Sequence, residues 1–156
     1  MISFRPATMA DARQIFDWRN DPLVRQNSFN QNELKWEEHL KWFEQKVNNS
    51  RCQMFIICNE NTIPIGQVRF DLDEKKTAVV SISLEEKFRS KGNGEESLRQ
   101  TCGHLTKEHK AERIIAYIKK ENKASYRSFL KAGFKVAAEA KIHSIDSYVL
   151  EWQKGA

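Results

Sequence analysis

One segment of the chain decides its fold, and it reads Leu84-Glu85-Glu86-Lys87-Phe88-Arg89-Ser90-Lys91-Gly92-Asn93-Gly94. It follows an alternating apolar pattern over residues 77–84, which is typical of a strand, and it precedes an apolar stripe at Leu98, Cys102 and Leu105, which is typical of a helix. Glycines let such a turn bring its backbone N–H groups together, and the N-terminus of the following helix attracts negative charge. The segment therefore predicts a phosphate-binding turn between a strand and a helix.

The spacing of these glycines excludes two common phosphate-binding motifs. A Rossmann fingerprint needs G-x-G-x-x-G after a first strand, and a P-loop needs G-K-S or G-K-T at its end. Neither pattern is present in the segment. Taken alone, the segment could also be an ordinary solvated turn, so its interpretation depends on the rest of the chain.

Hydropathy patterns outside this segment predict both strands and helices. Before the turn, we expect a strand at 2–6, helices at 8–20 and 32–47, and strands at 54–58, 63–71 and 77–84. After the turn, we expect the helix with the apolar stripe, a strand at 113–118, a helix at 123–132, and strands at 134–139 and 143–151. This order predicts an α+β fold, with a central twisted, mostly antiparallel sheet of about seven strands flanked by about four helices.

The composition fits one globular domain over residues 1–156. Of the 156 residues, 40% are hydrophobic, 10% aromatic and 30% charged, and six glycines and three prolines leave no low-complexity linker. No apolar run approaches the roughly 20 residues of a membrane span, and the first residues lack the apolar core of a secretory signal. Three cysteines without CxxC spacing suggest neither a disulfide framework nor a zinc site. We therefore expect a soluble, cytoplasmic protein with no membrane partner and no metal.

The positive charge of the chain is concentrated in one region. The net charge is +5, yet residues 107–135 hold nine Lys or Arg and three Glu, a local charge of +6. Such a region can bind a polyanion such as RNA, or it can bind one small, highly phosphorylated ligand. Composition does not distinguish these two kinds of ligand. No nucleic-acid motif accompanies it. We expect no nucleic-acid partner, and a non-enzymatic RNA-binding domain is a remote alternative.

Two sequence blocks resemble the GNAT superfamily of acetyl-CoA-dependent N-acetyltransferases. Arg89–Gly94 matches the superfamily's R/Q-x-x-G-x-G/A pyrophosphate loop, at the place where its fourth strand meets a helix. Residues 114–134 match its later block of strand, Asn-x-x-Ala/Ser, helix and closing Gly-Phe, with Asn122 and Ser125 in register. The resemblance covers most of the chain and implies the GNAT fold.

The resemblance also implies where acetyl-CoA binds. The pyrophosphate would lie on the turn, the pantetheine arm would pair with the edge of the preceding strand, and the basic helix after Asn122 would flank the 3′-phosphate. The implied cofactor-binding residues are Ile82, Ser83, Leu84, Arg89, Ser90, Lys91, Gly92, Asn93, Gly94, Asn122 and Arg127. Acetyl-CoA would act as a co-substrate, with direct attack by an amine and no nucleophilic side chain.

The N-terminal half resembles the acetyltransferases of bacterial nonulosonic (pseudaminic-type) sugar biosynthesis. The similar stretches include Asp17-Trp18-Arg19-Asn20-Asp21-Pro22 and Ile65-Gly66-Gln67-Val68-Arg69-Phe70. This resemblance implies that the acceptor is the 4-amino group of a nucleotide-linked (UDP-) deoxy-amino sugar, held by a monomer or homodimer. N-terminal acetyltransferases of ribosomal proteins share part of the pattern and are the alternative.

Residues for acceptor binding and proton transfer can be named from the same patterns. The usual tyrosine acid of the superfamily is replaced by Phe129, so Ser125 and Tyr126 are the available hydroxyls. His39 and Asp71 are candidate bases, beside Glu85 and ordered water. Structural roles remain the alternative for each of these side chains. The candidate acceptor-binding residues, which could pair with phosphates or contact a ring, are Trp18, Arg19, Arg25, Gln67 and Arg69.

Overall fold

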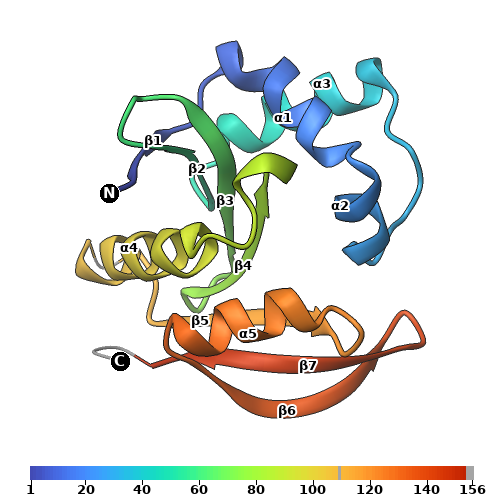
Figure 1. The fold of residues 1–156 in the computed structure, drawn as a ribbon, viewed down its shortest axis with the longest axis vertical. Helices are drawn as coiled ribbons and strands as arrows, with labels where there is room; N and C mark the ends of the chain where they lie inside the picture. Colours follow the sequence, from blue (N-terminus) through green and yellow to red (C-terminus); the bar gives the residue numbers. More distant parts are fainter. Residues whose placement is uncertain (109, 154–156) are drawn as a thin grey trace.

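The computed structural model describes residues 1–108 and 110–153 (Figure 1). Its strands are β1 (Ser3–Pro6), β2 (Cys52–Cys58), β3 (Pro64–Leu72), β4 (Thr77–Leu84), β5 (Arg113–Lys119), β6 (Phe134–Ile142) and β7 (Ile145–Trp152). Its α-helices are α1 (Ala12–Arg19), α2 (Pro22–Asn27), α3 (Trp36–Val47), α4 (Asn93–Lys107) and α5 (Lys123–Lys131). Two short 3-10 helices, η1 (Met9–Asp11) and η2 (Glu86–Phe88), complete the order.

The strands form one seven-stranded sheet in the order β1-β2-β3-β4-β5-β7-β6. Every neighbouring pair is antiparallel except β4 and β5, which run parallel. The predicted α+β class, with a mostly antiparallel sheet, is therefore confirmed. No helix in the described part of the chain is long and apolar enough to cross a membrane.

The parallel pair β4–β5 separates soon after it begins. Thr77–Val79 pairs with Arg113–Ile115, and no further pair follows between the two strands among the described residues. The second half of β4, Val80–Leu84, keeps β3 on one side and leaves its other edge open. Backbone N–H and C=O groups on such an edge are available to another extended group. This opening in the sheet lies directly before the glycine turn.

The alternation of side chains along β4 assigns the two faces of the sheet. Ala78 and Val80 lie in the core on the face covered by α4 and α5. Ser81 and Ser83 point to the opposite face, as predicted, where α1, α2 and α3 lie (Figure 1). We call the face covered by α4 and α5 the first face of the sheet. The face covered by α1, α2 and α3 is the second face.

The segment between α1 and α3 differs from the sequence expectation. The helix expected at 32–47 begins at Trp36, and a separate short helix, α2, follows Asp21. The Asn20 side chain explains the late start, because it accepts a hydrogen bond from Leu34 N at 2.8 Å and donates one to Leu34 O at 3.1 Å. This pair of bonds holds the chain before α3 in a non-helical path along the second face of the sheet.

Candidate functional site

The glycine turn has the backbone shape that an anion-binding loop requires. Gly92 has a φ of +81°, which is accessible to glycine at little cost, and Ser90 also has a positive φ of 61°. The Asn93 side chain donates to Phe88 O at 3.0 Å and braces the turn from within. Helix α4 then starts with free backbone N–H groups aimed out of its N-terminus. The predicted phosphate-binding turn thus has suitable geometry.

Gly94 leaves a gap between β4 and α5. A Cβ built on this glycine would lie 3.6 Å from Ser128 Oγ and 3.7 Å from Leu84 Cδ1, which is ordinary contact distance. A small side chain at position 94 would therefore not clash with the rest of the protein. Gly94 thus lies between Leu84, the last residue of β4, and the start of α4, which are the places expected to hold the pantetheine arm and the pyrophosphate. The described residues fit the cofactor expected from the sequence.

Arg89 ties the glycine turn to the N-terminal helices. Its Nε donates to Leu84 O at 2.9 Å, and its Nη2 forms an ion pair with Asp21 at 3.1 Å. Asp21 also caps α2 by accepting from Leu23 N and Val24 N. Burial alone would raise the pKa of Asp21, but the hydrogen bonds from Val24 and Arg89 outweigh it and lower that pKa. The Arg89 side chain thus supports the site from inside, and the turn offers its backbone to a ligand.

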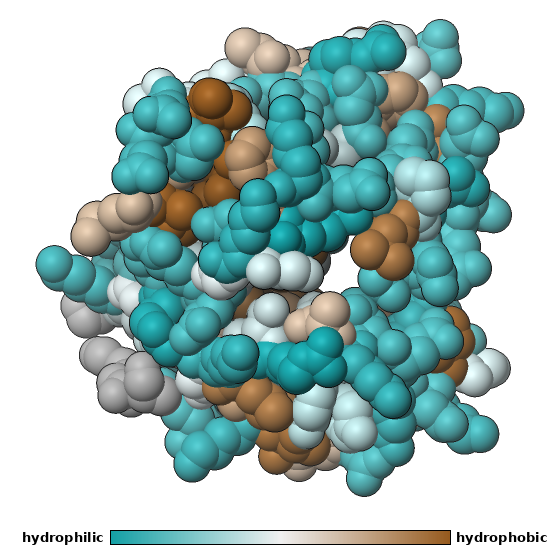
Figure 2. Space-filling view, viewed as in Figure 1, coloured by the Kyte–Doolittle hydropathy of each residue, from teal (hydrophilic) through white to brown (hydrophobic). Residues whose placement is uncertain are grey.

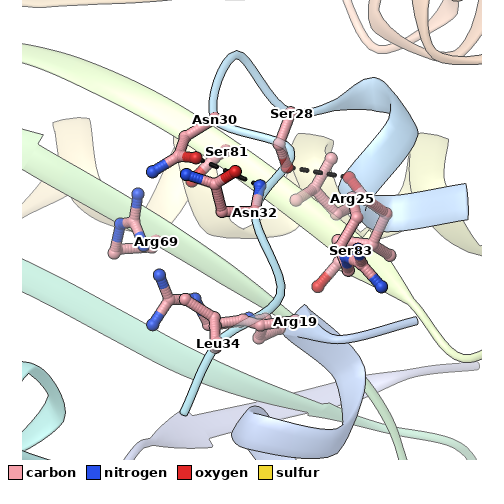
Figure 3. Close-up of a pocket in the computed structure, with 12 residues that line it drawn as sticks. Arg19, Arg25, Ser28, Asn30, Asn32, Leu34, Arg69, Ser81 and Ser83 are labelled. Carbon is pink, nitrogen blue, oxygen red and sulfur yellow. Dashed lines mark hydrogen bonds between the residues drawn. The ribbon is translucent and has the colours of Figure 1, made fainter. Parts of the chain in front are cut away.

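A cavity of about 260 Å³ lies on the second face of the sheet, between the open end of β4 and the segment from α2 to α3 (Figure 3). The space-filling view is hollowed between the half that carries α1–α3 and the half that carries α5 (Figure 2). The cavity is lined by Arg19, Val24, Arg25, Ser28, Asn30, Asn32, Leu34, Gln67, Arg69, Ser81, Ile82 and Ser83. Four of the five predicted acceptor-binding residues therefore meet at one place.

The cavity is strongly cationic because three arginines line it and no carboxylate does. Arg19 stacks on the Trp42 ring at 3.8 Å and forms no ion pair among the described residues. Burial, and the nearby charge of Arg69, lower the pKa of Arg19 to about 10. Arg69 lies 5.1 Å from the same ring and is partly neutralised by Asp71. An anion bound between these guanidinium groups would relieve their repulsion.

Two polar atoms in the cavity wall have no hydrogen-bond partner. Gln67 Oε1 and Ser83 Oγ are both buried and unpaired. Gln67 is only 6% exposed. The two residues are directly opposite each other on β3 and β4, so their side chains share one face of the sheet. Buried polar atoms are normally paired, so these two mark a place where a ligand or water can bind.

His39, one of the three side chains named as candidate bases, is engaged within the protein. His39 is buried, its Nε2 lies 2.8 Å from Ala12 O, and its Nδ1 lies 3.1 Å from Arg19 Nη1. Since the guanidinium can only donate, Nδ1 accepts and Nε2 carries the proton. Burial, together with the Arg19 charge, lowers the pKa of His39. The ring therefore has no free lone pair and orients Arg19 instead.

Asp71 is held in an ion-pair network at the far end of β3. Lys46 Nζ lies 2.8 Å from one carboxylate oxygen and Arg69 Nε lies 3.0 Å from the other. Burial raises the pKa of Asp71, but the charges of Arg69 and Lys46 outweigh burial and lower it. Asp71 does not line the cavity. Its position suits the support of Arg69 rather than the uptake of a proton from an acceptor.

Trp18 lies in the core and not in the cavity. It is 4% exposed and packs among α1, α3 and β2, and its indole N–H points to Glu85 at 3.4 Å. The structure therefore does not support the expected stacking of Trp18 on an acceptor. The periodicity of α1 could not separate an aromatic core residue from an aromatic ligand contact.

The hydroxyl candidates on α5 occupy different surroundings. Asn122 caps this helix by accepting from Ser125 N at 3.2 Å, and the Ser125 hydroxyl has no partner among the described residues. Tyr126 stacks on Tyr148 with ring centroids 4.6 Å apart. Phe129, at the position of the usual tyrosine, is 1% exposed in the core. Arg127 lies exposed on the surface of the same helix.

Several residues of the site were not anticipated from the sequence. Asn30, Asn32 and Ser81 line the cavity, and the first two belong to the non-helical path before α3. Lys119, at the end of β5, is 1% exposed and donates to Gln26 O at 2.8 Å. A clustering of asparagines at 27–32 was the available signal for this wall. No signal marked Lys119 as buried, because its burial depends on contacts with Gln26 and Phe29, which lie far away in the sequence.

Comparison with known proteins assigns this arrangement to a family. The family model described as "Acetyltransferase (GNAT) domain" matches residues 2–135. None of the curated proteins compared with the chain matches it. Within residues 1–108 and 110–153, no group of three or more His, Cys, Asp or Glu side chains is placed to hold a metal ion.

Solved acetyltransferase structures share the fold at low sequence identity. AAC(6')-Ib in complex with ribostamycin and coenzyme A gives a TM-score of 0.85 at 14% identity, over 98% of this chain and 93% of that chain. Spermidine N-acetyltransferase from Vibrio cholerae, in complex with CoA and spermine, gives 0.87 at 13%, over 96% and 94%. A putative phosphinothricin N-acetyltransferase gives 0.80 at 21%, over the whole of both chains.

These findings decide between the enzyme and its non-enzymatic alternative. The family match spans the glycine turn, the open strand β4 and the whole of the cavity wall. The alternative of a non-enzymatic domain is therefore wrong. The chain belongs to the GNAT acetyltransferase family and is an acetyl-CoA-dependent N-acetyltransferase.

Proposed function

We propose that this enzyme acetylates the 4-amino group of a nucleotide-linked deoxy-amino sugar. The observation that carries the proposal is the cationic cavity, which opens beside the free edge of β4. One end of the site suits a thioester and the other suits an acceptor with negative charge. The three cysteines are free and buried, which is consistent with a reducing compartment such as the cytoplasm.

Acetyl-CoA would be held along the path from the glycine turn to the open edge of β4. The N–H groups at the start of α4 would receive its pyrophosphate. Ile82 and Leu84 would pair with the pantetheine arm through their backbone, since β5 leaves this edge free. The cofactor supplies the activated acetyl group as a thioester. A backbone N–H of the open edge would then polarise the thioester oxygen.

The amine must reach the thioester in its neutral form. None of the twelve cavity-lining residues is Asp, Glu or His. The amine of an amino sugar is already partly neutral near neutral pH, so it can enter the site without first giving a proton to a side chain. The neutral amine forms the C–N bond, the C–S bond breaks with its electron pair on sulfur, and the proton that the nitrogen gives up passes to water. A dedicated side-chain base is therefore unnecessary.

The leaving sulfur requires one proton, and α5 carries two candidate hydroxyls. Ser125 has a free hydroxyl at the first turn of α5, whereas Tyr126 is packed against Tyr148. A serine is a weak acid, so we assign Ser125 the role of orienting a water or relaying its proton. This assignment accounts for the replacement of the usual tyrosine by Phe129.

The charge of the cavity argues against an acceptor with several positive charges. Two of them were solved with ribostamycin or spermine, which carry several amines. A polycation would be repelled by Arg19, Arg25 and Arg69, which line the present cavity without a carboxylate. The phosphates of a nucleotide sugar would instead form charge-assisted hydrogen bonds with these arginines. N-terminal peptides are the competing acceptors.

A panel of acceptors tests the proposal. Thiol release from acetyl-CoA would be followed with a UDP-linked 4-amino-4-deoxy sugar, an alanine-initiated peptide, spermidine and kanamycin, and each product checked by mass. We expect kcat/KM for the nucleotide sugar to exceed that for each other acceptor by about a hundredfold or more, because only it places anions on the arginines. Turnover of the peptide or a polycation alone would refute the proposed acceptor and leave the family assignment intact.

A further inference from the structure

We propose that Gln67 and Ser83 form the binding site for the reacting amine itself, and this inference rests on the proposed function only for the identity of the acceptor. The two residues would receive the amine's N–H groups and direct its lone pair toward the open edge of β4. They would be catalytic residues, because they touch the reacting nitrogen. Neither is an acid or a base at neutral pH.

The unsatisfied state of both side chains carries the inference. Gln67 Oε1 and Ser83 Oγ are buried atoms with no hydrogen-bond partner. The Gln67 side chain is more than nine-tenths buried and lines the cavity. An unpaired buried acceptor costs stability, and a fold retains it where a ligand supplies the missing donor. A primary amine supplies two N–H donors, which matches the two free acceptors in number.

The register of the sheet places these acceptors beside the reacting carbon. Gln67 pairs directly with Ser83, and Ser83 lies in the half of β4 that β5 leaves open. An acetyl thioester held on that edge would therefore approach the backbone of Ser83, while its side chain and that of Gln67 occupy the cavity face. The amine and the carbonyl carbon of the thioester would then both lie next to Ser83 on β4.

Strand β3 determines how the acceptor lies in the cavity, with its amine at one end and its anionic group at the other. Arg69 follows Gln67 by two residues on β3, on the same face, about 7 Å further along the strand. The amine end and the anion end of the cavity are thus separated by roughly the width of one sugar ring. An acceptor with its amine directly next to its anionic group would not reach both ends.

Substitution with apolar side chains of similar size gives the test. We expect Gln67→Met and Ser83→Ala each to lower kcat/KM for the acceptor roughly tenfold, mainly through kcat, with the Kd of acetyl-CoA unchanged. We also expect Gln67→Met to raise Tm by about 2–4 °C, because it removes a buried unpaired acceptor. The reporter acceptor is whichever member of the panel the wild-type enzyme turns over, sugar or peptide.

A control on a neighbouring strand completes the design. Gln53, on β2, donates to Ser50 O at 3.3 Å and lies outside the cavity, so Gln53→Met is expected to leave kcat/KM unchanged. A lowered Tm for Gln67→Met would show that its amide is bonded within the protein and would overturn the inference. Unchanged kcat/KM in both Gln67→Met and Ser83→Ala would also overturn it. Neither result depends on whether the proposed sugar is the acceptor, so the two proposals fail separately.

Discussion

Replacing Gly94 with valine is expected to abolish the binding of acetyl-CoA while the protein stays folded. The side chain would fill the gap between Leu84 on β4 and Ser128 on α5, where a Cβ meets only ordinary contacts. That gap is the path proposed for the cofactor between the start of α4 and the open edge of β4. We expect the Kd of acetyl-CoA to rise by about a hundredfold or more, roughly 3 kcal/mol, in a calorimetric titration.

A second glycine of α4 provides the matched control. Gly103 has nothing within 4 Å of a built Cβ, so alanine there should stabilise the helix by about 1 kcal/mol without altering the Kd. Thermal unfolding would establish that both variants are folded. A Gly94→Val protein that unfolds like the wild type and binds acetyl-CoA with unchanged affinity would contradict the assigned path.

Replacing Arg19 with methionine is expected to remove most of the proposed preference for an anionic acceptor. Arg19 is positioned by the Trp42 ring and by His39 Nδ1, and among the described residues no ion pair neutralises it. Loss of a charge-assisted contact predicts a fall in kcat/KM of about a hundredfold for the nucleotide sugar, roughly 3 kcal/mol. The Kd of acetyl-CoA is expected to stay within about threefold, because the cofactor path lies along β4 and α4.

The charge and the position of Arg19 can be separated with two further variants. Arg19→Lys keeps the charge and is expected to restore part of the loss. Arg13, on the same helix, is largely exposed and lies outside the cavity, so Arg13→Met is expected to leave kcat/KM unchanged. Equal losses for the charged sugar and for an uncharged amine in Arg19→Met would show that Arg19 only supports the fold.

The features of this enzyme that depend on residues close together in the sequence were predictable from the sequence. The glycine turn needs a positive φ at Gly92 and a helix directly after it, and both requirements are local. Alternation along β4 correctly predicted that Ser81 and Ser83 share a face. Alternation along β3 similarly predicted that Gln67 and Arg69 lie together.

The parts that depend on distant contacts were not predictable. The late start of α3 follows from the bonds between Asn20 and Leu34, fourteen residues apart. That non-helical path brings Asn30 and Asn32 into the cavity wall. Trp18 was assigned wrongly for a related reason. An aromatic residue on an amphipathic helix can face the core or a ligand, and only the packing of α1 against β2 decides between the two.

The structure was also needed to exclude a covalent mechanism at this site. Cys102 lies in the core and Cys52 is buried, and burial raises the pKa of the Cys52 thiol to about 11. Ser81 and Ser83 line the cavity, but His39 has both ring nitrogens engaged and cannot activate them. The described residues of the cavity therefore provide no activated nucleophile for a covalent acetyl-enzyme. Acetyl transfer should require both substrates at once.

The initial-rate pattern of the two substrates distinguishes direct transfer of the acetyl group from transfer through an acetyl-enzyme. Rates would be measured at several fixed concentrations of acetyl-CoA while the acceptor concentration is varied, and plotted in double-reciprocal form. We expect lines that intersect, because the amine attacks the thioester only when both occupy the open edge of β4. Parallel lines, which are the pattern of a ping-pong reaction through an acetyl-enzyme, would contradict the account.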